Sequence, residues 1–292
     1  ETVMEKYTNF GDLPKENSTE KASQIVIIPV PYDETSTWIK GAEKGPEALI
    51  EASANMELYD IETDSQVYTK GIFTDIPILE NSSTEKMVES VAKTVKEKIK
   101  KNKFVVTIGG EHSVSIGAIK EHAKKYRNLS VLQLDAHSDL RSEYEGSKNN
   151  HACVMARAKE SCKIVQVGIR SMDSSEKNEV VSENIFYAYQ IKNNKEWDNQ
   201  AISSLNKNVY ITIDLDVFDP SIIPSTGTPE PGGLLWYETI SFLRKVIQEK
   251  NVIGFDVVEL CPNKYNKAPD FLAAKLIYKL LSYRFYSGGE DE

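Results

Sequence analysis

The segment FVVTIGGEHS, residues 104–113, decides the fold class of this 292-residue chain. Its first five residues are apolar or β-branched, which is typical of a strand covered on both faces of a sheet. Gly109 and Gly110 give the backbone freedom to turn sharply. An amphipathic pattern over Ser113–Tyr126 follows and predicts a helix, with Ser113 as its cap. A strand, a turn and a helix in this order predict an α/β protein.

The same unit recurs along the chain. Strands are predicted at Gln24–Pro31, Gly71–Ile76, Phe104–Ile108, Leu129–Asp135, Lys163–Ile169, Asn184–Tyr189, Asn208–Asp214 and Val252–Val258. Further helices are predicted at Pro46–Tyr59, Thr84–Lys101, Ala152–Glu160, Glu196–Asn206, Trp236–Glu249 and Asp270–Tyr283. This alternation indicates a parallel sheet with right-handed crossovers. Periodicity alone does not decide between a closed barrel and an open, doubly wound sheet.

We expect a single α/β domain over residues 1–292, with an N-terminal extension at about 1–22 and a flexible tail at 288–292. The polar stretches Glu176–Glu183 and Lys192–Asn199 are interpreted as surface loops or helix ends.

Composition narrows the range of partners. The net charge of −9 disfavours nucleic acid, which requires a basic surface, and agrees better with a small cation. No apolar run is long enough to span a membrane, and the N-terminal residues do not resemble a signal peptide. Cys153, Cys162 and Cys261 form no CxxC pair and are expected to be small buried side chains. These features predict a cytoplasmic protein without a membrane partner.

Polar side chains gather where three predicted strands end, at TIGGEHS (107–113), LQLDAHSDLR (132–141) and ITIDLDVFDP (211–220). Ligand sites of parallel α/β proteins lie at such ends. Because alternate side chains of a strand share a face, the acids and the histidine of DAHSD are expected on one side, and so are both acids of DLD. Carboxylates crowded in this way repel one another unless a cation lies among them.

These strand ends predict a metal centre. Oxygen and imidazole ligands without thiolate suit Mn²⁺ or a similar ion, and zinc and iron stay open. Six ligands are too many for one reactive ion and suit two. The candidate ligands are His112, Asp135, His137, Asp139, Asp214 and Asp216.

Three further polar residues lie near predicted strand or helix ends or within a predicted helix. Glu259 ends the last predicted strand, where an acid beside an apolar run is unusual. His151, in KNNHACVMARA, precedes a predicted helix and by itself would be interpreted as a helix-start residue. His122, in the charged pattern EHAKKYRN, is predicted to be exposed to solvent.

Taken together, these motifs resemble the ureohydrolase family, which includes arginase, agmatinase, guanidinobutyrase and formimidoylglutamase. The resemblance covers nearly the whole chain, from VPYDETSTWIKGAEKGPEALIEAS (30–53) through GGEHS, DAHSD and DLDVFDPSIIPSTGTPEPGGL to GFDVVEL. It implies an open eight-stranded, mainly parallel sheet with helices on both faces. It also implies two Mn²⁺ per chain and a homotrimer or homohexamer.

The resemblance assigns roles to the ligands. His112 and Asp139 would bind the deeper ion, and His137 and Asp216 would bind the other. Asp135 and Asp214 would bridge the two.

Other roles follow from the same resemblance. In the mechanism expected for such a site, Asp139 would also relay the proton from the attacking hydroxide. His151 matches the family's proton shuttle, and Glu259 matches the acid that binds the substrate guanidinium. Asp173, in GIRSMDSS, matches a position near the far end of the substrate.

The implied reaction is hydrolysis of a small cationic guanidino compound. The segment before His151, GSKNNHA, lacks the Ser-Gly-Asn-x-His-Gly pattern of arginases and is most similar to that of agmatinases. Agmatine is therefore the predicted substrate, with urea and putrescine as products. Guanidinobutyrate, guanidine, aminopropylagmatine, arginine and formimidoylglutamate remain alternatives, as do a single-ion deacetylase and a non-catalytic binding scaffold.

Overall fold

One open parallel sheet organises the computed structural model, which describes residues 9–286. Its eight strands lie in the order β2-β1-β3-β8-β7-β4-β5-β6, and β2 and β6 form free edges, so the sheet is not a barrel. The strands are β1 (Ile25–Val30), β2 (Ile72–Thr74), β3 (Phe104–Gly109), β4 (Leu129–Leu134), β5 (Lys163–Ile169), β6 (Ile185–Tyr187), β7 (Asn208–Asp214) and β8 (Asn251–Val258).

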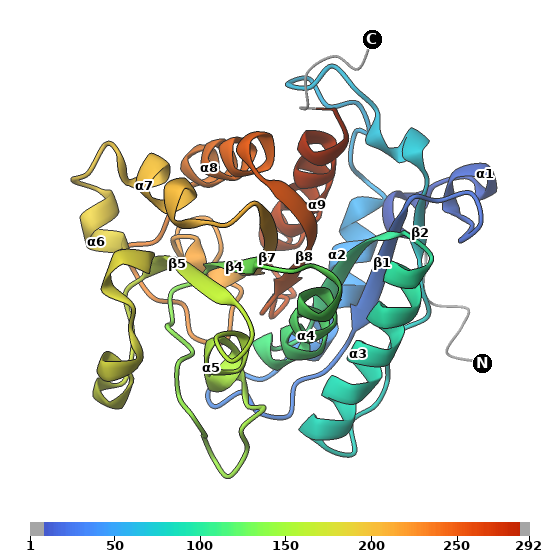
Figure 1. Ribbon diagram of the computed structural model, residues 1–292. Helices are drawn as coiled ribbons and strands as arrows, with labels where there is room; N and C mark the ends of the chain where they lie inside the picture. The colour runs from blue at the N-terminus through green and yellow to red at the C-terminus, as the bar shows by residue number, and fades with distance from the viewer. Residues whose placement is uncertain (1–8, 287–292) are drawn as a thin grey trace.

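Helices cover both faces of the sheet (Figure 1). On one face α3, α4 and α5 contact one another in turn, and on the other α2, α9, α8 and α7 do so. The helices within residues 9–286 are α1 (Lys15–Ser18), α2 (Gly45–Ser53), α3 (Thr84–Lys100), α4 (Ser115–Lys125), α5 (Val154–Ala158), α6 (Ala188–Ile191), α7 (Trp197–Ser204), α8 (Trp236–Glu249) and α9 (Ala268–Tyr286). The predicted α/β class with an open, parallel sheet is confirmed.

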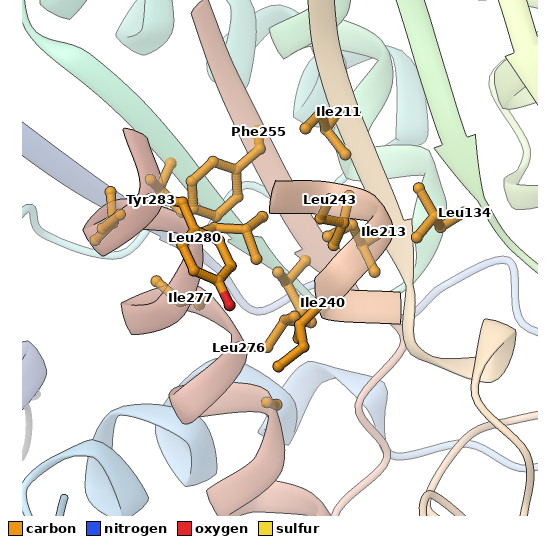
Figure 2. Packing of buried hydrophobic residues seen from close by; sticks show 14 of the residues in the cluster. Leu134, Ile211, Ile213, Ile240, Leu243, Phe255, Leu276, Ile277, Leu280 and Tyr283 are labelled. Carbon is orange, nitrogen blue, oxygen red and sulfur yellow. The ribbon is translucent and has the colours of Figure 1, made fainter. Parts of the chain in front are cut away.

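Each face of the sheet has its own apolar core. Along β1, Ile25 and Ile27 pack in the core beneath α2, α8 and α9, whereas Val26 and Ile28 pack against α3 and α4. Figure 2 shows part of the first core, where Phe255 of β8 lies among side chains of α9. Each such buried side chain contributes about 1.5–3 kcal/mol, so the alternation along β1 fixes the strand between the two layers.

Several predicted boundaries were wrong by a few residues. The helix predicted over Pro46–Tyr59 ends at Ser53, and α4 begins at Ser115. Ser113 does not cap α4, because it lies in a short 3-10 helix and its hydroxyl donates a hydrogen bond to the buried Glu111 carboxylate. The prediction for Trp236–Glu249 matches α8.

The predicted exposure of His122 was also wrong, because this side chain is fully buried. It lies on the inner face of α4, three residues after Ile119, with its ring 4.8 Å from that of Tyr210 on β7. Gly254 of β8 makes the space, since a Cβ there would come within 2.7 Å of His122 Nε2. Lys124, Lys125 and Arg127 of the same segment are exposed, whereas Glu121 is buried as well.

The remaining sequence predictions have mixed outcomes. Cys153 and Cys162 are buried as expected, but Cys261 is partly exposed. The predicted tail at 288–292 lies outside the described residues. No helix within residues 9–286 is long and apolar enough to cross a membrane.

Candidate metal centre

Four adjacent central strands bring the predicted site residues together. The strands β3, β8, β7 and β4 are neighbours in the sheet, although β8 lies far from β3 in the sequence. All four are parallel, so their carboxyl ends meet at one edge. His112 follows β3, Glu259 follows β8, Asp214 ends β7 and Asp135 follows β4.

The candidate ligands after β4 lie in a loop, so the predicted alternation of these side chains along a strand was wrong. β4 ends at Leu134, so Asp135, His137 and Asp139 do not alternate across a pleat. Asp139 instead has a left-handed backbone (φ 52°), and the His137 N–H donates to the Asp135 carboxylate. Loop geometry therefore turns these side chains to one side.

The loop after β7 is joined to the loop after β4. Asp214 Oδ1 accepts a hydrogen bond from the Asp216 N–H at 2.9 Å. Asp216 Oδ1 in turn accepts one from the Ala136 N–H, also at 2.9 Å. These bonds hold the two ligand-bearing loops in register.

The first group of ligand atoms surrounds His112. Its Nδ1 lies 2.9 Å from Asp139 Oδ2 and 3.1 Å from Asp135 Oδ2. Asp214 Oδ2 lies 3.6 Å from the same nitrogen. All four side chains are buried, so these charges have little access to water.

The second group surrounds His137. Its Nδ1 lies 2.8 Å from Asp216 Oδ2 and 3.6 Å from Asp135 Oδ1. Asp135 therefore belongs to both groups. Asp214 lies beside the first group but is not one of the three residues whose ligand atoms lie close together in either group. One carboxylate shared by two clusters suits a pair of ions bound side by side.

The hydrogen bonds of His112 indicate that a cation belongs in the first group. Thr212 donates its hydroxyl proton to Asp256 at 2.6 Å, so towards His112 Nε2, 2.9 Å away, it acts as an acceptor. In the neutral ring the proton is then on Nε2, and the Nδ1 lone pair faces carboxylate oxygens. Buried Nδ1 has no hydrogen-bond partner within residues 9–286. A metal ion satisfies these facing lone pairs, and the donor set fits Mn²⁺ or a similar divalent ion.

The pKa shifts have the same origin. Burial by itself disfavours a charged imidazole, yet the Asp135 and Asp139 carboxylates raise the pKa of His112 well above its usual range. Burial and the facing Asp135 carboxylate raise the pKa of Asp139 to about 7. Burial and the neighbouring Asp216 raise the pKa of Asp214. Each shift reports an excess of buried negative charge.

Glu259 lies beside this centre. Its backbone is left-handed (φ 68°), and its N–H donates to the Gly110 carbonyl at 2.7 Å. Its Oε1 accepts a hydrogen bond from the His112 N–H at 2.7 Å. Burial and the neighbouring Glu111 raise the pKa of Glu259 well above its usual range. A cationic group in the cavity would offset this unfavourable charge.

His151 faces the same cavity from the start of a 3-10 helix (His151–Cys153). Its Nδ1 lies 3.0 Å from the Thr35 hydroxyl. Burial, together with positive charge on His112 and His137, lowers the pKa of His151 to about 4. This value is below the ordinary imidazole pKa of about 6.5.

A cavity of about 290 Å³ joins these residues to the surface. Asp173 lines it and is half exposed, with Arg141 Nη2 3.9 Å away. Its Oδ1 also accepts a hydrogen bond from the Ser175 N–H at 2.9 Å, so one carboxylate oxygen is already hydrogen-bonded within its own turn.

Sequence reasoning missed several lining residues, among them Trp38, Arg141, Tyr144 and Glu176. Glu176 lies in a stretch predicted as surface loops or helix ends, and it is found in the first turn of a 3-10 helix (Ser174–Glu179) with its side chain buried. It accepts hydrogen bonds from the Ser138 hydroxyl at 2.7 Å and the Leu140 N–H at 2.8 Å. The spacing Asp173-x-x-Glu176 is that of a capping box, which the structure forms, and this spacing was the available sequence signal. Trp38 lies within the quoted segment 30–53, Arg141 lies within the quoted segment 132–141, and Tyr144 follows three residues later, so their position in or beside these motifs was the available signal.

Comparison with known proteins agrees with this geometry. The family model described as Arginase family matches residues 23–282. An N(1)-aminopropylagmatine ureohydrolase of Synechocystis is 40% identical over 89% of this chain and 88% of its own. An agmatinase of Pyrococcus horikoshii is 33% identical over 89% of this chain and 92% of its own.

Solved structures agree as well. The agmatine ureohydrolase of Thermoplasma volcanium is 27% identical and superposes with a TM-score of 0.84 over 95% of this chain and 94% of its own. The proclavaminate amidino hydrolase of Streptomyces clavuligerus is 25% identical, with a TM-score of 0.85 over 95% and 97%.

The sheet, the paired ligand clusters and these matches define a hydrolase that acts on guanidino compounds. The chain belongs to the arginase family of ureohydrolases. This membership confirms the predicted family and enzyme class and argues against the single-ion deacetylase.

Proposed function

We propose that this enzyme hydrolyses agmatine to urea and putrescine. The charge of the cavity is the observation that carries the proposal. Six carboxylates line it against one guanidinium, that of Arg141. Three of the six, on Asp139, Asp214 and Asp216, belong to the proposed ligand set. The other three are those of Asp173, Glu176 and Glu259. Together with the positive charge of Arg141 they give a formal net charge of −2, which balances a guanidinium and an ammonium.

We infer that His112, Asp135, His137, Asp139, Asp214 and Asp216 hold two divalent ions, Mn²⁺ being the one proposed. Asp135 is the residue best placed to serve both ions, because it belongs to both ligand groups. The chemistry that two such ions supply when bound is activation of water as a nucleophile at neutral pH.

Substrate orientation is the role proposed for Glu259. Its Oε1 is fixed by the His112 N–H, next to the first ligand group. A carboxylate in this position binds a guanidinium through charge-assisted hydrogen bonds, which would place the guanidinium carbon at the metal centre. Asp173, farther out on the cavity wall, is proposed to bind the ammonium tail.

Proton movement is proposed for two groups. Asp139 accepts the proton that the attacking water loses, and His151 donates a proton to the departing amine. Because the resting ring of His151 is neutral at pH 7, it must take up a proton in each catalytic cycle before it donates one.

N(1)-aminopropylagmatine is the second candidate substrate. The relative from Synechocystis that carries this name is more similar to this chain, at 40% identity, than the agmatinase of P. horikoshii, at 33%. N(1)-aminopropylagmatine carries a guanidinium and two ammonium groups, one cation more than a charge of −2 balances, so the charge of the cavity favours agmatine and sequence similarity favours the longer compound. The longer tail would extend past Asp173 to the cavity mouth, where Trp38 is 70% exposed.

A panel of substrates tests the proposal. Urea release is measured with added Mn²⁺ on agmatine, N(1)-aminopropylagmatine, arginine and 4-guanidinobutyrate. We expect kcat/KM to be at least about 100-fold higher for the amine-tailed compounds, because a carboxylate tail would face unpaired acids. A higher kcat/KM for arginine or 4-guanidinobutyrate would contradict the proposal that the cavity binds an amine tail.

The substitution His151→Asn tests the proton donor. We expect kcat to fall about 100- to 10,000-fold, the usual contribution of a positioned acid, with KM and manganese content nearly unchanged. Unchanged turnover would remove His151 from the mechanism.

We further propose that the enzyme is a cytoplasmic homotrimer or homohexamer, as its family resemblance suggested. Light scattering of the purified protein tests the assembly, and a monomer would contradict it.

A further inference from the structure

One hydroxyl group, that of Thr35, contacts His151 twice. The His151 backbone N–H donates to Thr35 Oγ1 at 3.0 Å. The ring Nδ1 lies 3.0 Å from the same oxygen. Anchoring both the backbone and the ring to one atom restricts rotation of the imidazole. The two residues are 116 positions apart, so no local sequence pattern signals this contact.

Thr35 is itself held by the buried Glu111. Its hydroxyl donates to Glu111 Oε1 at 2.6 Å, and its backbone N–H donates to Oε2. The next backbone N–H, that of Ser36, donates to Oε2 at 3.0 Å. Glu111 directly precedes His112, so the turn that carries a proposed metal ligand also fixes the loop that holds His151.

The proton count at Thr35 Oγ1 determines the tautomer of His151. A hydroxyl has one proton to donate and two lone pairs that accept. The proton is committed to Glu111, and one lone pair accepts the His151 backbone N–H. The second lone pair can only accept, so the ring must carry a hydrogen on Nδ1. The lone pair of the neutral ring is then on Nε2.

We propose that Thr35 is a positioning residue that holds His151 as its Nδ1–H tautomer and leaves Nε2 to exchange protons in the cavity. In the protonated ring both nitrogens carry hydrogen. Transfer from Nε2 to the departing amine leaves the neutral Nδ1–H form, which the Thr35 hydroxyl stabilises. This inference rests on the proposed role of His151.

The test uses Thr35→Val, which removes the hydroxyl but keeps the shape, and Thr35→Ser, which keeps the hydroxyl. For Thr35→Val we expect kcat to fall about 10- to 100-fold, as for other residues that orient a functional group, with KM and bound manganese within twofold of the parent. Thr35→Ser should stay within about threefold of the parent. Thr94→Val is the matched control, because this hydroxyl bonds only a carbonyl of its own helix and lies away from the cavity.

A double substitution separates positioning from a general structural effect. In the His151→Asn background, Thr35→Val should cause no further loss, since the group it positions is gone. An additional 10-fold loss there, or full kcat in Thr35→Val alone, would overturn the inference. If Thr35→Val lowers the thermal stability markedly, failure of Thr35→Ser to restore kcat overturns it too. The role of His151 is judged separately, from His151→Asn alone.

Discussion

His112 and His122 lie ten residues apart, both are fully buried, and their surroundings are opposite. His112 Nδ1 faces the carboxylates of Asp135 and Asp139 within 3.1 Å. His122 faces Tyr210 and Tyr126, with its Nδ1 2.8 Å from the Ala118 carbonyl.

The protonation of the two imidazoles differs accordingly. Burial lowers the pKa of His122 to about 4. The same burial acts on His112, yet carboxylates raise its pKa well above the usual range. Burial therefore does not mark a functional histidine. What distinguishes His112 as a candidate metal ligand is the buried negative charge around it, which requires a cation.

The largest expected effect comes from removing the carboxylate that both ligand groups share. In Asp135→Asn we expect loss of bound metal together with a fall in kcat/KM of about 1000-fold or more, because activation of water accounts for several kcal/mol of the barrier. Metal analysis and urea release measure both. Full retention of two ions per chain would contradict the assignment of Asp135.

Removal of the metal is expected to have the next largest effect, on stability. Chelation leaves the carboxylates around His112 without their cation. Free metal at 1000 times its Kd raises the free energy of unfolding by about 4 kcal/mol per site. Removal of the metal by chelation should therefore lower Tm by roughly 10 °C. Calorimetry with and without chelator, followed by added Mn²⁺, measures it. An unchanged Tm would mean that no ion binds in the folded state.

The smallest expected effect is at His122 and concerns acid stability alone. Its folded pKa of about 4 lies below the unfolded value of 6.5, so between these values the unfolded chain binds more protons. Stability from this residue is complete above pH 6.5 and is lost as the pH falls towards 4. The facing charges are those of Glu121 and Lys125 on its own helix, and Tyr126 and Tyr210 pack against the ring.

In His122→Asn, whose amide nitrogen can still donate to the Ala118 carbonyl, this titration is absent. The free energy of unfolding lost between pH 7 and pH 4.5 should be about 2 kcal/mol smaller than in the parent. Denaturant unfolding at both pH values measures the difference. Metal content at pH 7 should not change, and its loss would break the contrast between the two histidines.

Much of the site could be predicted because its ligands lie in short, dense motifs. DAHSD and DLD each place acids next to an apolar strand, where only a ligand or a buried charge explains them. GGEHS adds two glycines at a turn. Gly110 is required there, since a Cβ would lie 1.9 Å from the Tyr32 carbonyl oxygen.

His122 shows how local composition misled the prediction. Its neighbours EHAKKYRN are mostly charged, but Ala118, Ile119 and His122 share one face of α4 at helical spacing. The helical spacing of these residues indicated that His122 lies on the buried face, whereas the charged composition of the segment suggested exposure.

The α/β class and the candidate ligands could be predicted from the sequence, and the resemblance of its motifs predicted the family, because strand-end motifs and apolar periodicity are local properties of the chain. The position of β8 between β3 and β7, which places Glu259 beside His112, became known from the folded chain. The tertiary structure alone placed Thr35 against His151, across 116 residues. Contacts of this kind depend on the packing of distant elements, and packing leaves no periodic pattern in a single sequence.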